Sequence, residues 1–115
     1  MMPFARIHLE EVSEDEKYSL VIQVFLDPTN TPVSSYPYAG WRGIPNPTEW
    51  CWPIVFKPDG TVDYGGAGGD DRAERRGEMN IYDRPFKTGA VYVMKHFDGS
   101  EPSQFVVRDI RVIEG

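Results

Sequence analysis

The chain has 115 residues, of which 40% are hydrophobic, and these values fit one domain, residues 1–115, with a modest core. Its formal net charge of −6 argues against nucleic-acid binding, because phosphate recognition usually needs a basic surface. A single cysteine, Cys51, excludes an intramolecular disulfide, so a small disulfide-stabilised secreted domain is excluded as well.

The N-terminal residues contain no apolar run of the length that a signal peptide needs. No stretch elsewhere is apolar and long enough to predict a membrane-spanning helix. We therefore expect a cytoplasmic protein that binds neither membranes nor nucleic acids. Its oligomeric state does not follow from the sequence.

The first two predicted strands, Phe4–Val12 and Tyr18–Leu26, form a hairpin around the polar turn Ser13–Lys17. Apolar residues occupy every second position of the second strand, from Tyr18 to Leu26. Its other face also carries apolar side chains, at Val21 and Phe25. Apolar residues on both faces indicate a strand that is buried on both sides, so we place it centrally.

The segment 27–53 holds six of the ten prolines and all three tryptophans. Prolines at this density exclude a helix and leave few N–H donors for a sheet. We therefore predict one long connection. Connections of this length within a compact domain are often binding loops or lids.

Two interpretations of these aromatic residues remain open. In the first, Trp50 and Trp52 cover an open end of the fold as core residues. In the second, Tyr36, Tyr38 and Trp41 stay partly exposed and anchor a partner, as aromatic side chains often do. We expect a mixture, in which Trp52 is buried in a strand and Trp41 projects from a glycine-flanked loop.

The rest of the chain predicts a second hairpin, Trp52–Lys57 with Thr61–Tyr64, and three further strands. In the last strand we expect Val106, Ile110 and Val112 to share one face. Six or seven strands without a convincing helix predict an all-β domain, a small antiparallel β-barrel or sandwich with two long irregular loops. The three further strands are Met79–Tyr82, Ala90–Phe97 and Gln104–Ile113.

Residues that could support chemistry do not form a recognised site. The glycine-rich segment Tyr64–Asp71 fails to match G-x-G-x-x-G in register, and no predicted helix follows it. Asp70 and Asp71 could bind a hard cation through oxygen, but the spacing of a calcium loop is absent. His8 and His96 lie on separate strands without an evident third zinc ligand. We therefore predict no metal, no cofactor and no catalytic residue.

The C-terminal third contains the stretch Gly77–Gly89, with the pattern G-x-x-N-I-x-D-R, followed by Tyr92 and the closing segment Phe105–Ile110. This third of the chain resembles the small β-barrel immunity proteins of bacterial toxin–immunity systems. The resemblance implies a cytosolic protein that blocks a cognate toxin by binding it. It implies neither the identity of the toxin nor the residues in contact with it.

We therefore predict a non-catalytic protein-binding module, most concretely an immunity or inhibitor protein. Acidic side chains would steer a basic toxin domain towards it, and aromatic side chains would anchor the complex. Two alternatives stay open: a barrel that binds a small molecule or carbohydrate through its loop tryptophans, and a small enzyme with acidic or histidine acid–base groups. The candidate partner contacts are Tyr36, Tyr38, Trp41, Arg42, Asp70 and Asp71.

Overall fold

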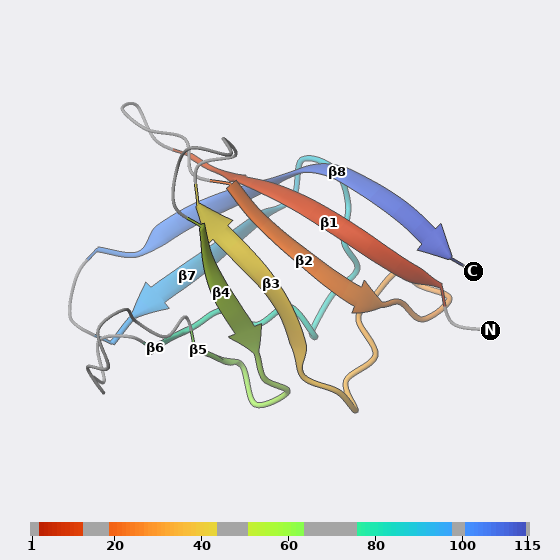
Figure 1. The fold of residues 1–115 in the computed structure, drawn as a ribbon, viewed down its shortest axis with the longest axis horizontal. Coiled ribbons are helices and arrows are strands. Elements are labelled where there is room, and N and C mark those ends of the chain that lie inside the picture. The colour runs from red at the N-terminus through yellow and green to blue at the C-terminus, as the bar shows by residue number, and fades with distance from the viewer. Residues whose placement is uncertain (1–2, 13–18, 44–50, 64–75, 98–100, 115) are drawn as a thin grey trace.

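A computed structural model shows an all-β protein built as one closed antiparallel barrel (Figure 1). It describes residues 3–12, 19–43, 51–63, 76–97 and 101–114. The barrel class is as predicted, although these residues form eight strands rather than six or seven. The strands are β1 Phe4–Glu11, β2 Ser19–Phe25, β3 Tyr38–Gly43, β4 Cys51–Phe56, β5 Thr61–Asp63, β6 Arg76–Glu78, β7 Val91–His96 and β8 Ser103–Glu114.

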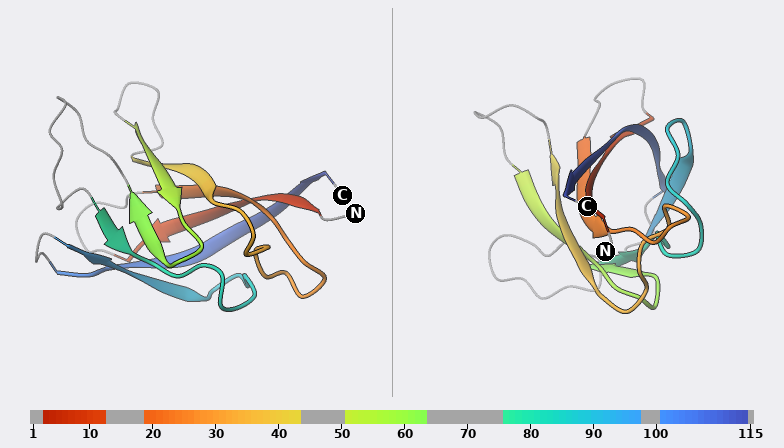
Figure 2. Two further views of the ribbon diagram at one scale, coloured as in Figure 1. Left: turned by 90° about the horizontal axis from the view of Figure 1, so that it is seen from below. Right: turned by 90° about the vertical axis from the view of Figure 1, so that its right-hand side faces the viewer.

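The strands follow one another around the barrel in chain order, and β8 returns to pair with β1. Each strand is antiparallel to the next, so the start of β1 and the end of β8 lie together (Figures 1 and 2). We call this the terminal end of the barrel. Its three connections, 26–37, 57–60 and 79–90, lie wholly within the described residues.

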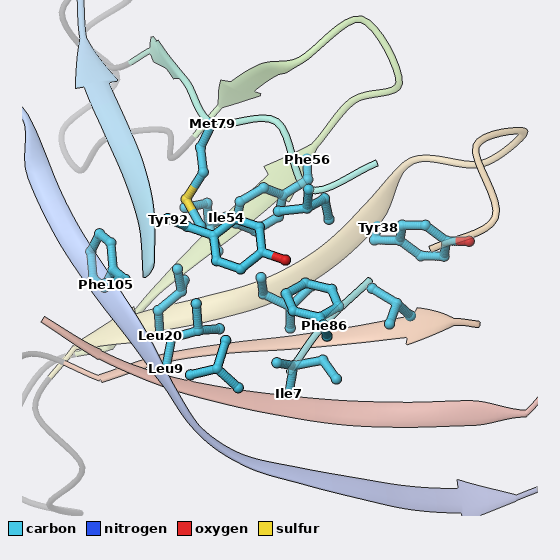
Figure 3. Close-up of a cluster of buried hydrophobic side chains, with 14 of the residues drawn as sticks. Ile7, Leu9, Leu20, Tyr38, Ile54, Phe56, Met79, Phe86, Tyr92 and Phe105 are labelled. Atoms are coloured by element: carbon cyan, nitrogen blue, oxygen red, sulfur yellow. The ribbon is translucent and has the colours of Figure 1, made fainter. Parts of the chain in front are cut away.

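The core fills the inside of the barrel, because alternate residues of the strands point inwards (Figure 3). An eight-stranded barrel is just wide enough for side chains to fill its interior. The largest of these side chains are aromatic and come from strands on opposite sides of the barrel. Inward-pointing strand residues are Ala5, Ile7, Leu9, Leu20, Ile22, Val24, Ile54, Phe56, Val62, Tyr92, Met94, Phe105 and Val107.

The connection 79–90 closes the terminal end. Phe86 is 1% exposed, its ring centroid lies 5.2 Å from that of Tyr92, and its backbone N–H donates to the Asn30 carbonyl at 3.0 Å. Met79 and Ile81 are also buried. The predicted strand Met79–Tyr82 is therefore wrong, because its apolar alternation comes from a segment folded into the barrel end rather than from a ladder.

β2 is not buried on both faces as predicted. Phe25 is 38% exposed, since the outer side of a closed barrel faces solvent. The face predicted for the last strand is also wrong, because β8 contains a bulge. His8 pairs with Asp109 and Leu9 with Val107, which leaves one extra residue between the two pairs and reverses the alternation beyond it.

The single long connection predicted over 27–53 is wrong as well, because it contains β3. The prolines of this segment lie before and after Tyr38–Gly43, so the strand itself keeps its N–H donors. Gly40 lets β3 approach β2 closely. A Cβ atom at Gly40 would lie 1.9 Å from the Val21 carbonyl oxygen, a distance that no side chain can occupy.

Candidate functional site

The structure divides the aromatic residues that were predicted to contact a partner. Tyr36 and Trp41 are 47% and 37% exposed, in line with the exposure expected of them. Tyr38 is only 5% exposed, so its expected exposure is wrong. Its hydroxyl donates to the Val33 carbonyl at 2.7 Å, and its ring stacks on Tyr82 with centroids 5.7 Å apart. Burial raises the pKa of Tyr38, which fits a structural rather than a contact residue.

Arg42 follows Trp41 in the chain but lies on the other face of β3. It pairs with Leu20, an inward-pointing residue. Its positive charge also acts on Glu11, where burial raises the carboxyl pKa and Arg42 partly offsets that rise. The structure therefore separates Arg42 from Trp41. The predicted contacts Asp70 and Asp71 lie outside the described residues.

Trp41 instead belongs to a row of outward-pointing residues that crosses four strands. Trp41 on β3 pairs with Val21 on β2, Val21 pairs with His8 on β1, and His8 pairs with Asp109 on β8. The neighbouring position on β1 and β8 holds Arg6 opposite Arg111. These six residues line a groove of about 300 Å³ on the outer wall of the barrel. We call it the outer-wall groove.

The groove is locally positive on a chain that is acidic as a whole. Arg6 and Arg111 supply two positive charges to the lining, and Asp109 supplies one negative charge. The Arg6 guanidinium lies 5.7 Å from the centre of the Trp41 ring, a distance at which cation and aromatic face attract each other. The groove thus combines an aromatic ring with the hydrogen-bond donors of two positively charged side chains.

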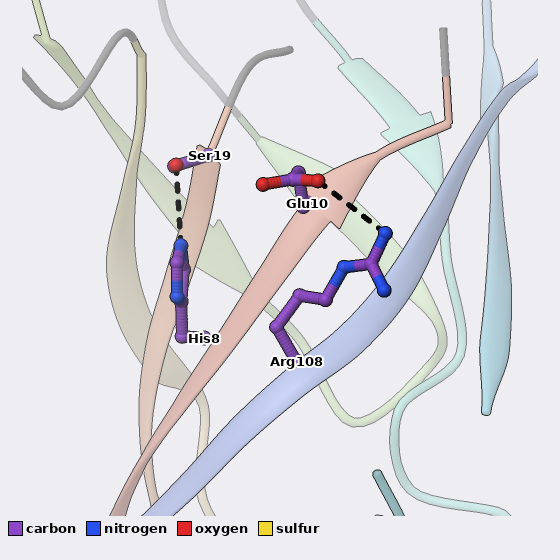
Figure 4. Close-up of polar contacts among 4 residues, drawn as sticks. All are labelled: His8, Glu10, Ser19 and Arg108. Atoms are coloured by element: carbon purple, nitrogen blue, oxygen red, sulfur yellow. Dashed lines mark hydrogen bonds and ion pairs between the residues drawn. The ribbon is translucent and has the colours of Figure 1, made fainter. Parts of the chain in front are cut away.

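His8 is held at the edge of this groove by a hydrogen bond between its Nε2 atom and the Ser19 hydroxyl, at 3.2 Å (Figure 4). Arg108 and Glu10 form an ion pair at 3.4 Å, and neither of these two residues lines the groove (Figure 4). An exposed pair of this kind contributes little to stability. Both contacts order polar side chains around the groove without occupying it.

An aromatic row continues the outer wall towards the terminal end. Phe4 on β1 pairs with Phe25 on β2, and their ring centroids lie 5.0 Å apart. The Tyr36 ring follows at 6.2 Å from Phe25. Because Phe25 and Val21 share the outer face of β2, Tyr36 and Trp41 flank one continuous surface. We call this surface, on β8, β1, β2 and β3, the long wall.

The two histidines that could have served an enzyme do not share a face. His8 points outwards, whereas His96 lies on the face of β7 that holds the buried Tyr92 and Met94. His96 and the Ser103 hydroxyl form a hydrogen bond of 2.9 Å.

Within the described ranges there is no group of three His, Cys, Asp or Glu side chains that could hold a metal ion. In the same part of the chain, no helix has the length and apolar composition needed to cross a membrane.

Comparison with known proteins returns no match: no protein-family model, no curated protein and no solved structure matches this chain. The similarity to immunity proteins proposed from the C-terminal third is thus not tested by these comparisons.

Arg6, Val21 and Arg111 were not singled out from the sequence, although all three line the groove. Arg6 and His8 share a face because they lie two positions apart on β1. The missing information was the pairing of β1 with β8, which joins residues about a hundred positions apart. No local pattern encodes that pairing, so only closure of the barrel brings the second arginine to the first.

Proposed function

We propose that this protein is a non-catalytic protein-binding module and that the long wall is its binding surface. One observation carries the proposal: Trp41 remains 37% exposed and lines a groove, on a strand that is paired on both sides. Tryptophan is the residue type that most often supplies binding energy at protein interfaces, where it fills a pocket near the centre of the contact. A tryptophan kept at a sheet surface is suited to that role.

The surroundings of Trp41 support a contact area larger than one side chain. Phe25 and Tyr36 are also exposed and lie on the same wall, with Phe4 packed beside them. Scattered apolar side chains on a surface need no explanation, but a contiguous apolar patch with a polar border is typical of an interaction site. Phe4, Phe25 and Tyr36 form such a patch. The outward-pointing pair Arg6 and Gln23 forms its polar border on the side of Trp41.

The most concrete form of the proposal is an immunity protein that blocks a toxin by covering part of its surface. The net charge of −6 would accelerate encounter with a basic toxin domain, because opposite long-range potentials raise association rates. This form of the proposal also draws on the resemblance of the C-terminal third. The long wall would then supply the contacts that hold the complex after encounter.

A small-molecule site inside the barrel has less support. The described interior is packed with the protein's own side chains, among them Phe56, Phe86 and Tyr92. A ligand of any size would have to displace core residues, at a cost of several kcal/mol for each large side chain. The outer wall is therefore the better place for a partner.

The test is capture of a partner from lysate of the protein's own source by the tagged wild type, Trp41→Ala and Phe97→Ala. Phe97 is the matched control, because it is an exposed aromatic residue (49%) next to β7, away from the long wall. We expect one protein to be retained by the wild type and Phe97→Ala and to be lost with Trp41→Ala. Retention on all three proteins, or on none, would contradict the proposal.

The toxin–immunity form needs a second measurement on the captured partner. When the partner is produced alone in bacteria, we expect growth to stop, and co-production of the wild-type protein should restore it. Co-production of Trp41→Ala should restore growth less well. If the captured partner is harmless to cells, the protein is still a binding module, but the proposed immunity function is wrong.

A further inference from the structure

The outer-wall groove carries a charge opposite to that of the whole protein. The chain has 18 acidic and 12 basic residues, yet two of the six groove residues are arginines and only one is acidic. The net negative charge of the protein acts on the whole partner at long range. At contact distance, the positive groove attracts an anionic group. The groove therefore points to a specific anionic contact.

The two arginines are placed where their charges repel. Arg6 and Arg111 are direct cross-strand partners on β1 and β8, and like charges at directly opposite positions destabilise a sheet. Neither forms an ion pair with Asp109 or with another acidic side chain among the described residues. An anion bound between the two guanidinium groups would remove this repulsion.

Trp41 defines the second half of the ligand. The Arg6 guanidinium lies over its ring at 5.7 Å from the centroid, and Val21 on β2 is its cross-strand neighbour. A flat or apolar group attached to the anion would pack on this surface, and stacking on an aromatic ring strengthens binding beyond the area that it buries. The volume of about 300 Å³ suits one or two side chains rather than a folded element.

We infer that the outer-wall groove binds an acidic side chain of the partner protein that stands next to an aromatic side chain. The carboxylate lies between Arg6 and Arg111, since guanidinium groups bind carboxylates through paired N–H donors, and the aromatic ring packs on Trp41. This inference rests on the proposed function, because it specifies what the long wall recognises. It assigns a local acidic motif to a partner whose overall charge is basic.

The groove can be tested without the partner, by NMR titration of the full chain with phenylacetate. The Trp41 indole N–H and the Arg6 and Arg111 side-chain N–H signals report on the site directly. We expect saturable shifts confined to groove residues, with an affinity in the millimolar range that is usual for so small a ligand. Phenylacetamide has the same shape without the charge and should bind at least tenfold more weakly.

The matched variants are Arg6→Gln with Arg111→Gln, and Arg108→Gln as control. Arg108 is an exposed arginine on β8 that pairs with Glu10 and does not line the groove. The double variant should lose the phenylacetate response, and Arg108→Gln should keep it. Inorganic phosphate serves as a second probe, and equal or tighter binding of phosphate would contradict the assignment of a carboxylate.

The outcomes separate this inference from the proposed function. If the captured partner needs Trp41 but binds the double arginine variant as tightly as the wild type, the inference is wrong and the binding surface stands. If the partner is insensitive to Trp41→Ala, the proposed function itself is wrong. An absent phenylacetate response in the wild type, with the Trp41 indole signal visible, would also overturn the inference.

Discussion

The two sides of this barrel differ in how their strands are joined. On the long wall, β1 pairs with β2 and β8 along its whole length. On the opposite side, which we call the short wall, β5 and β6 have three residues each. The described residue pairs number two between β4 and β5, three between β5 and β6, and two between β6 and β7. The short wall depends for its closure on the connection 79–90, which packs into the barrel end.

This difference indicates where a site can be held firmly. On the long wall, β3 pairs with β2 and β4, and β1 pairs with β2 and, on either side of a bulge, with β8. The positions of Trp41 and Arg6 therefore follow from the register of these paired strands. A binding surface on regular strands is more precisely placed than one on loops. The sequence suggested a loop as the working surface, whereas the structure places Trp41 on a strand.

The largest expected effect is on the short wall, with Phe86→Ala. Phe86 is 1% exposed and packs on Tyr92, so its removal should lower the free energy of unfolding by about 4 kcal/mol. Denaturant unfolding measures the change. The control Val93→Ala alters an exposed β7 residue and should cost less than about 0.5 kcal/mol. Similar losses for the two variants would show that the connection 79–90 does not hold the short wall.

The next effect belongs to the long wall, with Gly40→Ala. Its added Cβ would meet the Val21 carbonyl oxygen, so β2 and β3 would have to separate, at a cost of about 3 kcal/mol. Gly89→Ala is the control, since nothing lies within 4 Å of its Cβ position and its cost, about 1 kcal/mol, comes only from a φ of 92°. If Gly40→Ala were the milder change, close approach of β3 would not be what fixes Trp41.

Tyr82 links the two walls, because its single hydroxyl proton is shared between the carbonyl oxygens of Tyr36, at 2.7 Å, and Phe56, at 3.1 Å. Tyr82→Phe should cost about 1–2 kcal/mol through these lost bonds. Burial raises the pKa of Tyr82 above its ordinary value of 10.0, so the folded state holds the proton more tightly than the unfolded chain. The contribution of Tyr82 to the free energy of unfolding is therefore fully present below pH 10 and is lost as the pH rises through the raised pKa.

Thermal unfolding between neutral pH and about pH 11 checks this prediction. Over the range in which tyrosine titrates, we expect the melting temperature to fall more steeply with pH in the wild type than in Tyr82→Phe. Burial also raises the pKa of Tyr92, so some alkaline sensitivity should remain in the variant. Identical slopes for the two proteins would contradict a partly buried, hydrogen-bonded Tyr82.

The smallest effect concerns the charges of the groove. Arg111→Glu replaces a like-charge pair with an opposite-charge pair across from Arg6, which should raise the free energy of unfolding by about 0.5 kcal/mol. The same change should abolish the response to phenylacetate. A variant that is less stable than the wild type would show that the two arginines do not repel each other.

Much of the fold could be predicted from local patterns. The alternation of Ile7 and Leu9 and of Leu20, Ile22 and Val24 marked the inner faces of β1 and β2. The bulge in β8 could not be foreseen, because it depends on the pairing of Leu9 with Val107 rather than on the strand's own sequence. The exposure of Trp41 was predicted correctly, but the place of Arg111 opposite Arg6 depends on barrel closure.

The most direct test of the account is methyl NMR of the wild-type protein bound to its captured partner. Val21 lies in the groove on the long wall, and Val93 is exposed on β7 at the short wall. We predict large shifts for the Val21 methyl groups and unchanged signals for Val93. Shifts at Val93 with an unperturbed Val21 would show that the partner binds the other side of the barrel, and the long wall would no longer be its binding surface.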